Sequence, residues 1–512
     1  MDGFLLTEKL LRYAKKHLHL DEFDEVYTRN VLLSELKLSK PCEQNADLSS
    51  IDSMDVPDEL WQELKEYAIE NNLADDDTAD IFCANIFGLL TPVPSEINRE
   101  FHIIKEKSGI QAACDYLFDM CIKNGYIQKT AIARNLKWDY EDEKNKLEIT
   151  INLSKPEKNN KDIAKLLTMP QGNKYPQCML CKENEGFEGT MTHPPRRNLR
   201  TIKVNLNGEK WFMQYSPYAY YDEHCIVINE EHIPMRVDEK TPYKLLDFVD
   251  AFPNYFIGSN ASLPIVGGSI LNHEHYQGGR HLMPMHFAKI KKEYTASKYP
   301  DLKIGILDWY NSVIQIEGKS RDCVAAFAAE VIKEWKEFSC PECEIISHTG
   351  QTPHNAVSPI CRKSGDTYIM SLILRNNRTN EQYPDGIFHV HPEYQNIKSE
   401  GIGLIEAMGL FILPGRLKRQ LDEIENILFG KSQYDQNLYN DKNHDLYIHR
   451  NMIQKLMNEG MAKDKAQAHE RVQNYVNRVC AAILDNTSVF KNDEIGKKGF
   501  QKFIKTLNLQ EV

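Results

Sequence analysis

Residues 263–279 have the sequence LPIVGGSILNHEHYQGG, which sets closely spaced histidines between paired glycines. The pattern predicts a glycine-punctuated strand over residues 263–279. On a strand, alternate side chains share a face, so His273, His275 and Gln277 point the same way. Three hydrogen-bonding groups on one face are unfavourable in a hydrophobic core, but they suit a functional site. A surface strand with its polar side chains in water is the alternative. The zinc-protease pattern HExxH fails on spacing, because position 277 is Gln.

Small residues flank the histidines on both sides. Gly267, Gly268 and Ser269 precede them, and Gly278 and Gly279 follow. Glycine lets backbone N–H groups approach an anion closely, because no Cβ stands in the way. These five residues are therefore candidates for binding the phosphate of a substrate.

A pair of cysteines, Cys178 and Cys181, supplies two soft ligands upstream of this stretch. Twelve cysteines in 512 residues are too few for a disulfide scaffold, so a close pair indicates a metal site or a redox pair. Thiolate and imidazole suit zinc, and His232 and His273 are the natural remaining ligands. Four protein ligands would close the site and make the metal structural, and His275 would then not be one of its ligands. A redox pair or two buried thiols is the alternative.

A second pair, Cys340 and Cys343, is followed by His348 and His354 at a compact, knuckle-like spacing. It also belongs to an internal echo, in which CxxC, a lone His and His-x-His occur twice in the same order. The copies are Cys178/Cys181, His232, His273/His275 and Cys340/Cys343, His354, His389/His391. The intervals from the first Cys to the first His of the pair differ, at 95 and 49 residues, so duplication is only suggested.

Positive charge is concentrated in the run HPPRRNLR at residues 193–200. Arginine forks match phosphate oxygens in a bidentate manner, which makes Arg196 and Arg197 candidates for substrate binding. Arg280 and Arg362 are weaker candidates of the same kind. An exposed basic turn is the alternative for the run.

The composition argues against several classes of protein. Asp and Glu total 74 against 62 Lys and Arg, so the net charge is −12 and binding along a nucleic-acid backbone is not expected. No run approaches the roughly 18 apolar residues of a membrane span, and the start of the chain has no uninterrupted apolar segment typical of a secretory signal. We expect a soluble, cytoplasmic protein.

The first region, residues 1 to about 135, has helical patterns. Within residues 56–72, apolar side chains recur at helical spacing after a proline in a plausible first turn. They are Leu60, Leu64, Tyr67 and Ala68. The polar passage SKPEKNNKD at residues 154–162 indicates a boundary.

Short strand-like runs begin at Cys178. They include a hairpin around Asn207-Gly208 and strand candidates at 224–229, 368–374 and 387–391. Helices are predicted at 244–256 and 323–338, and long helical segments return beyond Gly401. We therefore expect an α+β fold in four parts: a mainly helical part at 1–165, two α+β parts at 166–300 and 301–415, and a helical part at 416–512.

The residue types around His275 suit group transfer at phosphorus. A neutral imidazole on a rigid strand can attack phosphorus directly and form a reactive phosphoramidate. A sugar phosphate leaves as a weakly basic anion, so the site needs positioning and charge stabilisation rather than a general acid. The absence of an obvious acidic pair beside His275 fits this chemistry better than hydrolysis by water.

With these motifs, the chain resembles the type 2 galactose-1-phosphate uridylyltransferases of low-GC Gram-positive bacteria. Residues 263–279 match that family's pattern at nearly all positions, and the chain length and helical N-terminal part also resemble type 2. Ser262 stands where Asp is usual and Asn272 where a small residue is usual, and neither difference removes an assigned chemical group. More distantly, the segment is similar to the type 1 transferases and to the histidine triad superfamily.

The resemblance implies a reaction: UDP-glucose and galactose 1-phosphate would give glucose 1-phosphate and UDP-galactose by a ping-pong route through uridylyl-His275. Gln277 would orient the phosphate, and Glu406 would contact a sugar hydroxyl. The implied fold has two histidine-triad-like halves, each an antiparallel sheet with helices, and the implied assembly is a homodimer. A nucleotide hydrolase or phosphorylase of the same superfamily, or a zinc-stabilised binding protein, is the alternative.

The resemblance also implies a metal and no organic cofactor. The residues that fall on the type 1 zinc ligands are Cys178, Cys181, His232 and His273. The residues that resemble the histidines of a second metal in type 1 are His354, His389 and His391, but no matching Glu follows Gln277.

Overall fold

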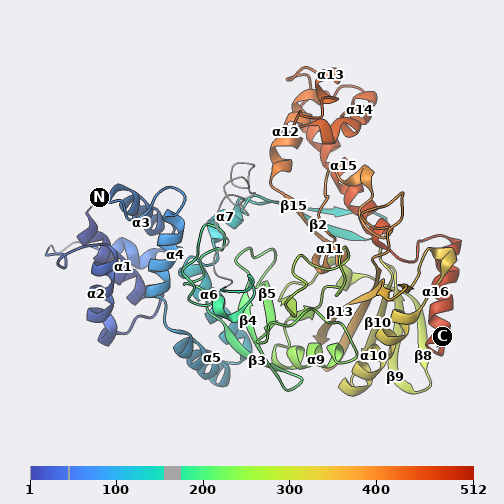
Figure 1. The fold of residues 1–512 in the computed structure, drawn as a ribbon, viewed down its shortest axis with the longest axis horizontal. Coiled ribbons are helices and arrows are strands. Elements are labelled where there is room, and N and C mark those ends of the chain that lie inside the picture. The colour runs from blue at the N-terminus through green and yellow to red at the C-terminus, as the bar shows by residue number, and fades with distance from the viewer. Residues whose placement is uncertain (1, 44–46, 144, 155–174) are drawn as a thin grey trace. The chain divides into compact units, whose positions relative to one another are not determined.

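The computed structural model describes the 512 residues except 1, 44–46, 144 and 155–174. They form two compact units. The first unit draws on the described parts of Met1–Arg134, Lys158–Ile233 and His273–Arg280, and the second on those of Asn135–Glu157, Pro234–Asn272 and His281–Val512. Both contain helices and antiparallel strands, which confirms the α+β class (Figure 1). Apart from Ser154, the expected boundary passage lies outside the described residues, and the four-part division stays a prediction.

The first unit begins with helices and ends with a sheet. Its helices are α1 (Gly3–His17), η1 (Glu22–Asp24), α2 (Glu25–Glu35), η2 (Ser49–Ser53), α3 (Asp58–Glu70), α4 (Ala79–Leu90), α5 (Pro94–Ser108), α6 (Ile110–Lys123), α7 (Lys129–Ala133) and η3 (Lys182–Asn184). Its strands are β3 (Ile202–Leu206), β4 (Glu209–Tyr215), β5 (Cys225–Asn229) and β7 (His275–Gly279). They pair in the order β7-β5-β4-β3, antiparallel throughout.

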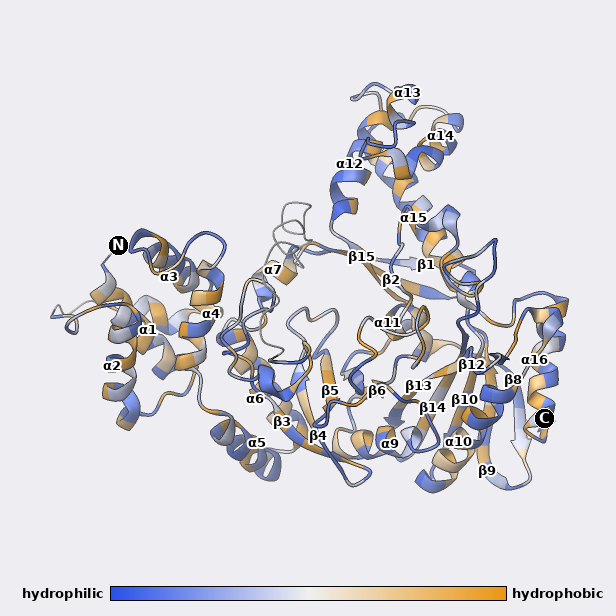
Figure 2. Cartoon of the chain, viewed as in Figure 1, coloured by the Kyte–Doolittle hydropathy of each residue, from blue (hydrophilic) through white to orange (hydrophobic). Residues whose placement is uncertain are grey.

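The helical pattern predicted for residues 56–72 is confirmed by α3. The helix buries the four side chains that the spacing selects, Leu60, Leu64, Tyr67 and Ala68. Pro57 occupies the N-cap position rather than the first turn. Figure 2 shows the same mixture of apolar and polar residues along the helices of both units, as expected for helices with one buried face.

The predicted hairpin at Asn207-Gly208 is also confirmed. It joins β3 to β4, and both turn residues have positive φ, 52° and 76°, as a two-residue turn of type I′ requires. The strand predicted at 224–229 is β5, which pairs with β4 on one side and with β7 on the other. Ile228 lies opposite His275, and Ile226 lies opposite Gln277.

The second unit contains a larger sheet and a smaller one. Its strands are β1 (Leu136–Glu141), β2 (Lys146–Asn152), β6 (Phe256–Gly258), β8 (Ile290–Ala296), β9 (Tyr299–Leu307), β10 (Val313–Gly318), β11 (His348–Thr349), β12 (Thr352–Pro353), β13 (Asn355–Ser364), β14 (Thr367–Asn376), β15 (Leu410–Pro414) and β16 (Leu509–Glu511). The larger sheet has the order β16-β8-β9-β10-β14-β13-β6, with every neighbouring pair antiparallel. The smaller sheet is β1-β2-β15, in which β15 runs parallel to β2.

Helices of the second unit cover one face of the larger sheet and form the C-terminal region. They are α9 (Thr241–Ala251), η4 (Pro284–Phe287), α10 (Arg321–Glu337), η5 (Pro341–Cys343), η6 (Pro392–Tyr394), α11 (Leu404–Ala407), α12 (Arg416–Leu428), α13 (Gln436–Tyr439), η7 (Tyr447–His449), α14 (Arg450–Asn458), α15 (Lys465–Thr487) and α16 (Glu494–Thr506). α9 and α10 pack on the sheet (Figure 1). Ser320 caps α10 by accepting from the backbone N–H of Cys323.

One predicted strand is shorter than expected, and another is wrong. Within 263–279 only His275–Gly279 is a strand, because the earlier residues turn back on themselves and a Cβ at Gly267 would collide with the carbonyl oxygens of Ala261 and Leu263. Residues 387–391 form no strand. They follow a turn at Gly386, where φ is 119°, and run into Pro392.

The predicted helices in this region are found with shifted bounds. The helix expected at 244–256 is α9, which ends at Ala251, and its last predicted residues instead lead into β6. The helix expected at 323–338 is α10, and the strand expected at 368–374 is β14. Among the described helices, none combines the length and the apolar character that a membrane span needs.

Candidate active site and metal centre

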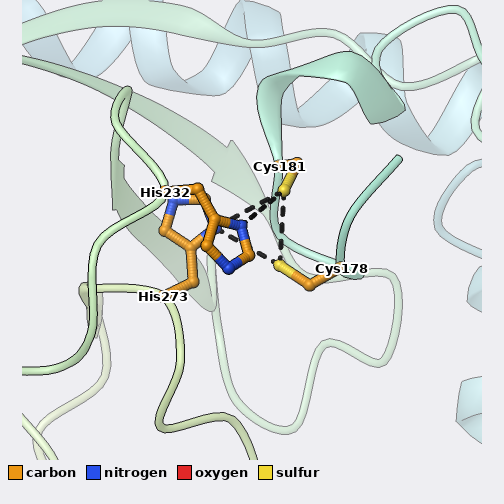
Figure 3. Close-up of side chains that lie close together, drawn as sticks. All are labelled: Cys178, Cys181, His232 and His273. Carbon is orange, nitrogen blue, oxygen red and sulfur yellow. Dashed lines mark hydrogen bonds between the residues drawn. The ribbon is translucent and has the colours of Figure 1, made fainter. Parts of the chain in front are cut away.

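Four side chains that are distant in sequence meet in the first unit: Cys178, Cys181, His232 and His273. Their ligand atoms all lie within 4.8 Å of one another, and Figure 3 shows the thiols and imidazoles turned toward a common point. Cys178 Sγ lies 3.5 Å from Cys181 Sγ and 3.3 Å from His273 Nδ1, and Cys181 Sγ lies 3.0 Å from His232 Nδ1. This group could hold a metal ion.

Local hydrogen bonds orient the side chains of this group. His273 Nε2 donates to the backbone oxygen of Asn229 at 2.9 Å, which leaves the Nδ1 lone pair directed at the thiols. The side chain of Asn184 donates to the carbonyl oxygens of Cys178 and Cys181, at 2.8 and 2.7 Å, and so fixes the CxxC turn. The ligand atoms are therefore oriented by the fold.

His275 is the first residue of β7, and one of its ring nitrogens is engaged in a hydrogen bond. Its Nδ1 donates to the backbone oxygen of His273 at 2.8 Å, so the lone pair is on Nε2. The side chain is 6% exposed, and burial lowers its pKa to about 4. At neutral pH the ring is therefore uncharged and carries a nucleophilic nitrogen.

The opposite face of β7 anchors the strand. Tyr276 is fully buried and stacks on Trp211 with ring centroids 4.8 Å apart. Glu274 accepts hydrogen bonds from Tyr276 Oη at 3.3 Å and from the side chain of Asn229 at 2.9 Å. Because side chains alternate along a strand, these contacts hold the backbone while His275 and Gln277 stand on the other face.

Gln277 has a partner that the sequence motifs did not single out. Its Oε1 lies 3.2 Å from Nε2 of His224, the residue that precedes β5. The sequence signal for it is modest: His224 is the first residue of the strand predicted at 224–229. The backbone pairing of Cys225 with Gly278 brings it into range.

The predicted substrate-binding residues after the histidines contact the segment at residues 219–224. A Cβ at Gly279 would come within 3.0 Å of the side chain of Tyr221 and of two backbone oxygens, so only glycine fits there. Arg280 forms ion pairs with Glu223 at 2.8 Å, Asp222 at 3.2 Å and Asp115 at 3.6 Å.

The arginines of the basic run at residues 193–200 lie in different environments. Arg196 lies over the ring of Tyr126 at 5.6 Å and donates to the backbone oxygen of Pro195. Arg197 packs against Gly88. Arg200, the last residue of the run, is 4% exposed and donates to backbone oxygens of residues 88, 91, 92, 197 and 199. Its burial lowers its pKa to about 10, and its contacts indicate a structural role.

The remaining predicted substrate-binding residues belong to the second unit. Gly267 and Gly268 lie in a tight loop, where Asn260 packs against the second glycine and Ser269 is exposed. Glu406 in α11 is paired with Lys398 at 3.0 Å and accepts from the backbone N–H of Gly403.

The second CxxC does not form the predicted knuckle. The Sγ atoms of Cys340 and Cys343 lie 3.1 Å apart. Both ring nitrogens of His354, however, are in hydrogen bonds with other side chains, those of Thr349 and Asn377. His354, His389 and His391 are not gathered either. Over the described ranges, the Cys178 group alone brings together three or more residues able to hold a metal. The knuckle that the spacing allowed is therefore not assembled among the described residues.

Comparisons with known proteins cover nearly the whole chain. Residues 19–234 match the family model described as galactose-1-phosphate uridyl transferase, N-terminal domain, and residues 248–438 match its C-terminal domain. A galactose-1-phosphate uridylyltransferase of Caldanaerobacter subterraneus subsp. tengcongensis is 43% identical over 520 aligned residues, which cover 100% of this chain and 99% of that protein. One of Bacillus subtilis is 41% identical and covers 99% and 98%.

Among solved structures, the yeast Ap4A phosphorylase Apa2 is similar with a TM-score of 0.34 and 11% identity, over 65% of this chain and 90% of that one. A score of this size supports no inference.

Proposed function

Because the chain belongs to the galactose-1-phosphate uridylyltransferase family, we propose that it transfers a uridylyl group from UDP-glucose to galactose 1-phosphate. The observation that carries the proposal is His275: a buried, uncharged imidazole on β7 whose Nδ1–H donates to the backbone, so that the ring's lone pair is on Nε2. Gln277 stands two residues further along the same face of β7.

In the first step, His275 Nε2 attacks the α-phosphorus of UDP-glucose. The N–P bond forms as the bond from phosphorus to the bridging oxygen breaks, and that oxygen leaves with glucose 1-phosphate. In the second step, a phosphate oxygen of galactose 1-phosphate attacks the same phosphorus and the N–P bond breaks. UDP-galactose is released and the neutral imidazole is restored. The Gln277 amide is suited to donate to the phosphoryl oxygens as charge develops there.

The test is product analysis of the purified protein with both substrates, separated by chromatography. We expect UDP-galactose and glucose 1-phosphate in equal amounts, and uridylyl-enzyme when UDP-glucose is supplied alone. UMP with glucose 1-phosphate would instead place the protein among hydrolases. Absence of turnover and of labelling would contradict the proposal and favour a binding protein.

We further propose that the Cys178 group binds a structural zinc ion. Tetrahedral zinc with bonds of about 2.3 Å to sulfur and 2.0 Å to nitrogen separates its ligand atoms by roughly 3.3–3.8 Å, and the hydrogen-bonding contacts among these atoms span 3.0–3.7 Å. Four protein ligands leave no open position for substrate. Since His273 supplies both a ligand and the carbonyl that holds His275, the metal would stabilise the position of the nucleophile.

Elemental analysis tests the metal, with the second cysteine pair as the matched control. We expect about one zinc per chain in the wild-type protein and in Cys343→Ser, and less than about half an equivalent in Cys178→Ser. A wild-type protein purified with less than about half an equivalent would contradict a resident zinc ion.

Other expectations remain predictions. They are a homodimeric assembly, a cytoplasmic location, and contacts of substrate with Arg196, Arg197, Gly267, Gly268, Ser269, Gly278, Gly279, Arg280 and Glu406.

A further inference from the structure

The side-chain amide of Gln277 is held by one neighbour. Its Oε1 lies 3.2 Å from His224 Nε2, and across the described part of the chain its amide nitrogen has no hydrogen-bond partner. An amide on a flexible side chain can present either its oxygen or its nitrogen to a phosphate. Only the nitrogen end donates, so the contact with His224 decides which end faces the substrate.

The surroundings of His224 fix its proton. The ring is 2% exposed and lies beside Tyr220 and Tyr221, with ring centroids 5.4 and 4.5 Å away. Burial lowers its pKa to about 4, so it has a single N–H at neutral pH. Nδ1 is buried without a partner among the described atoms. A proton on Nε2 therefore donates to Gln277, whereas a proton on Nδ1 would be a buried donor left unsatisfied, the costlier arrangement.

The segment that carries His224 is held by residues that follow the histidine motif. Arg280 pairs with Glu223, and its backbone N–H donates to the carbonyl of Asp222. Gly279 leaves room for the same segment, as noted above. Glu223 has a φ of 49°, a strained value for a residue other than glycine, so the local backbone is maintained by its contacts.

We propose that His224 is a positioning residue for uridylyl transfer: its Nε2–H holds Gln277 Oε1 so that the amide N–H groups point at the phosphoryl group bound by His275. This inference rests on the proposed function. It assigns His224 no contact with substrate, so its whole effect on the reaction passes through Gln277.

A double-mutant cycle tests this dependence with a pair of variants of similar shape. His224→Gln keeps an N–H donor near the position of Nε2, and His224→Met fills similar space without one. Each is made in the wild-type chain and in Gln277→Ala, and kcat and the KM for UDP-glucose are measured. Thermal unfolding of all four variants checks that they fold.

In the wild-type background, we expect His224→Met to lower kcat about tenfold, the loss of one oriented hydrogen bond, with KM within about threefold. His224→Gln should retain kcat within about threefold. In the Gln277→Ala background, the two variants should agree within about twofold, because there is no amide left to orient.

Two results would overturn the inference: equal kcat for His224→Gln and His224→Met in the wild-type background, or an unchanged difference between them in Gln277→Ala. Failure of the proposed function looks different, because the wild-type enzyme itself would then form no UDP-galactose.

Discussion

Two parts of the chain carry the same order of chemical groups, and only one of them assembles a site. The first copy consists of Cys178/Cys181, His232 and His273/His275. Its first four residues bring their ligand atoms together, and the fifth, His275, lies beside them. The second copy, Cys340/Cys343, His354 and His389/His391, is dispersed over separate local contacts. The same residue types in the same order therefore do not determine a site.

Strand pairing makes the difference. In the first copy, β5 and β7 are neighbours, and two backbone bonds extend their pairing, from Asn229 to Glu274 at 3.0 Å and from Glu274 to Ile233 at 2.7 Å. The loop after β5 therefore delivers His232 next to His273. In the second copy, His389 and His391 lie on no strand, and the ring of His391 stacks on Tyr383 instead.

The largest expected effect contrasts the last histidines of the two copies. His275→Ala removes the attacking nitrogen, so we expect loss of uridylyl-enzyme and a fall in kcat of at least about 10⁴-fold. His391→Ala should leave kcat within about threefold, because its ring contacts Tyr383 and a backbone oxygen. Labelling with UDP-glucose radioactive in its α-phosphate measures both. Label retained by His275→Ala would show that the nucleophile lies elsewhere.

An intermediate effect concerns His389, which is 6% exposed and has no partner for either ring nitrogen among the described atoms. Burial and the nearby charge of Arg375 lower its pKa to about 4, below the ordinary value of about 6.5. The folded chain therefore binds this proton less readily than the unfolded chain, and its contribution to stability declines as the pH falls from about 6.5 toward 4.

Replacing His389 by Phe should reduce this acid sensitivity. Urea unfolding between pH 7 and pH 5 should show a shallower fall in the free energy of unfolding than in the wild type, by up to about 1.4 kcal/mol per pH unit. Phe388→Leu changes packing at the neighbouring position without removing a proton-binding group, so its slope should equal that of the wild type. An unchanged slope in His389→Phe would refute the prediction.

The smallest expected effect tests what the two units share, a hairpin with a glycine turn. Gly208 in the β3–β4 turn and Gly365 in the β13–β14 turn have φ of 76° and 57°, and no atom lies within 4 Å of where a Cβ would be. Alanine at either position should cost about 1 kcal/mol of unfolding free energy through backbone strain alone. Asparagine, which tolerates this conformation, should cost less. A loss of several kcal/mol in urea unfolding would indicate contacts beyond the turn.

The local pattern of apolar residues predicted many of the helices and strands, but it placed their ends less accurately. The spacing of Leu60, Leu64 and Tyr67 suffices for α3, since a helix buries residues at fixed intervals. Apolar residues at 387–391 also suggested a strand, but they are buried in a loop. Whether a short apolar run becomes a strand depends on a partner that the run itself does not encode.

The sequence by itself determined the α+β class, the hairpin at Asn207-Gly208 and the shared strand face of His275 and Gln277. These depend on chemical identity and on periods of two or 3.6 residues. Only the tertiary structure decided which CxxC joins two histidines, that Arg200 is structural, and that His224 contacts Gln277. The contacts Cys181–His232, His224–Gln277 and Arg200–Pro92 join positions 51, 53 and 108 residues apart in sequence. They depend on strand register and loop path, which no local period specifies.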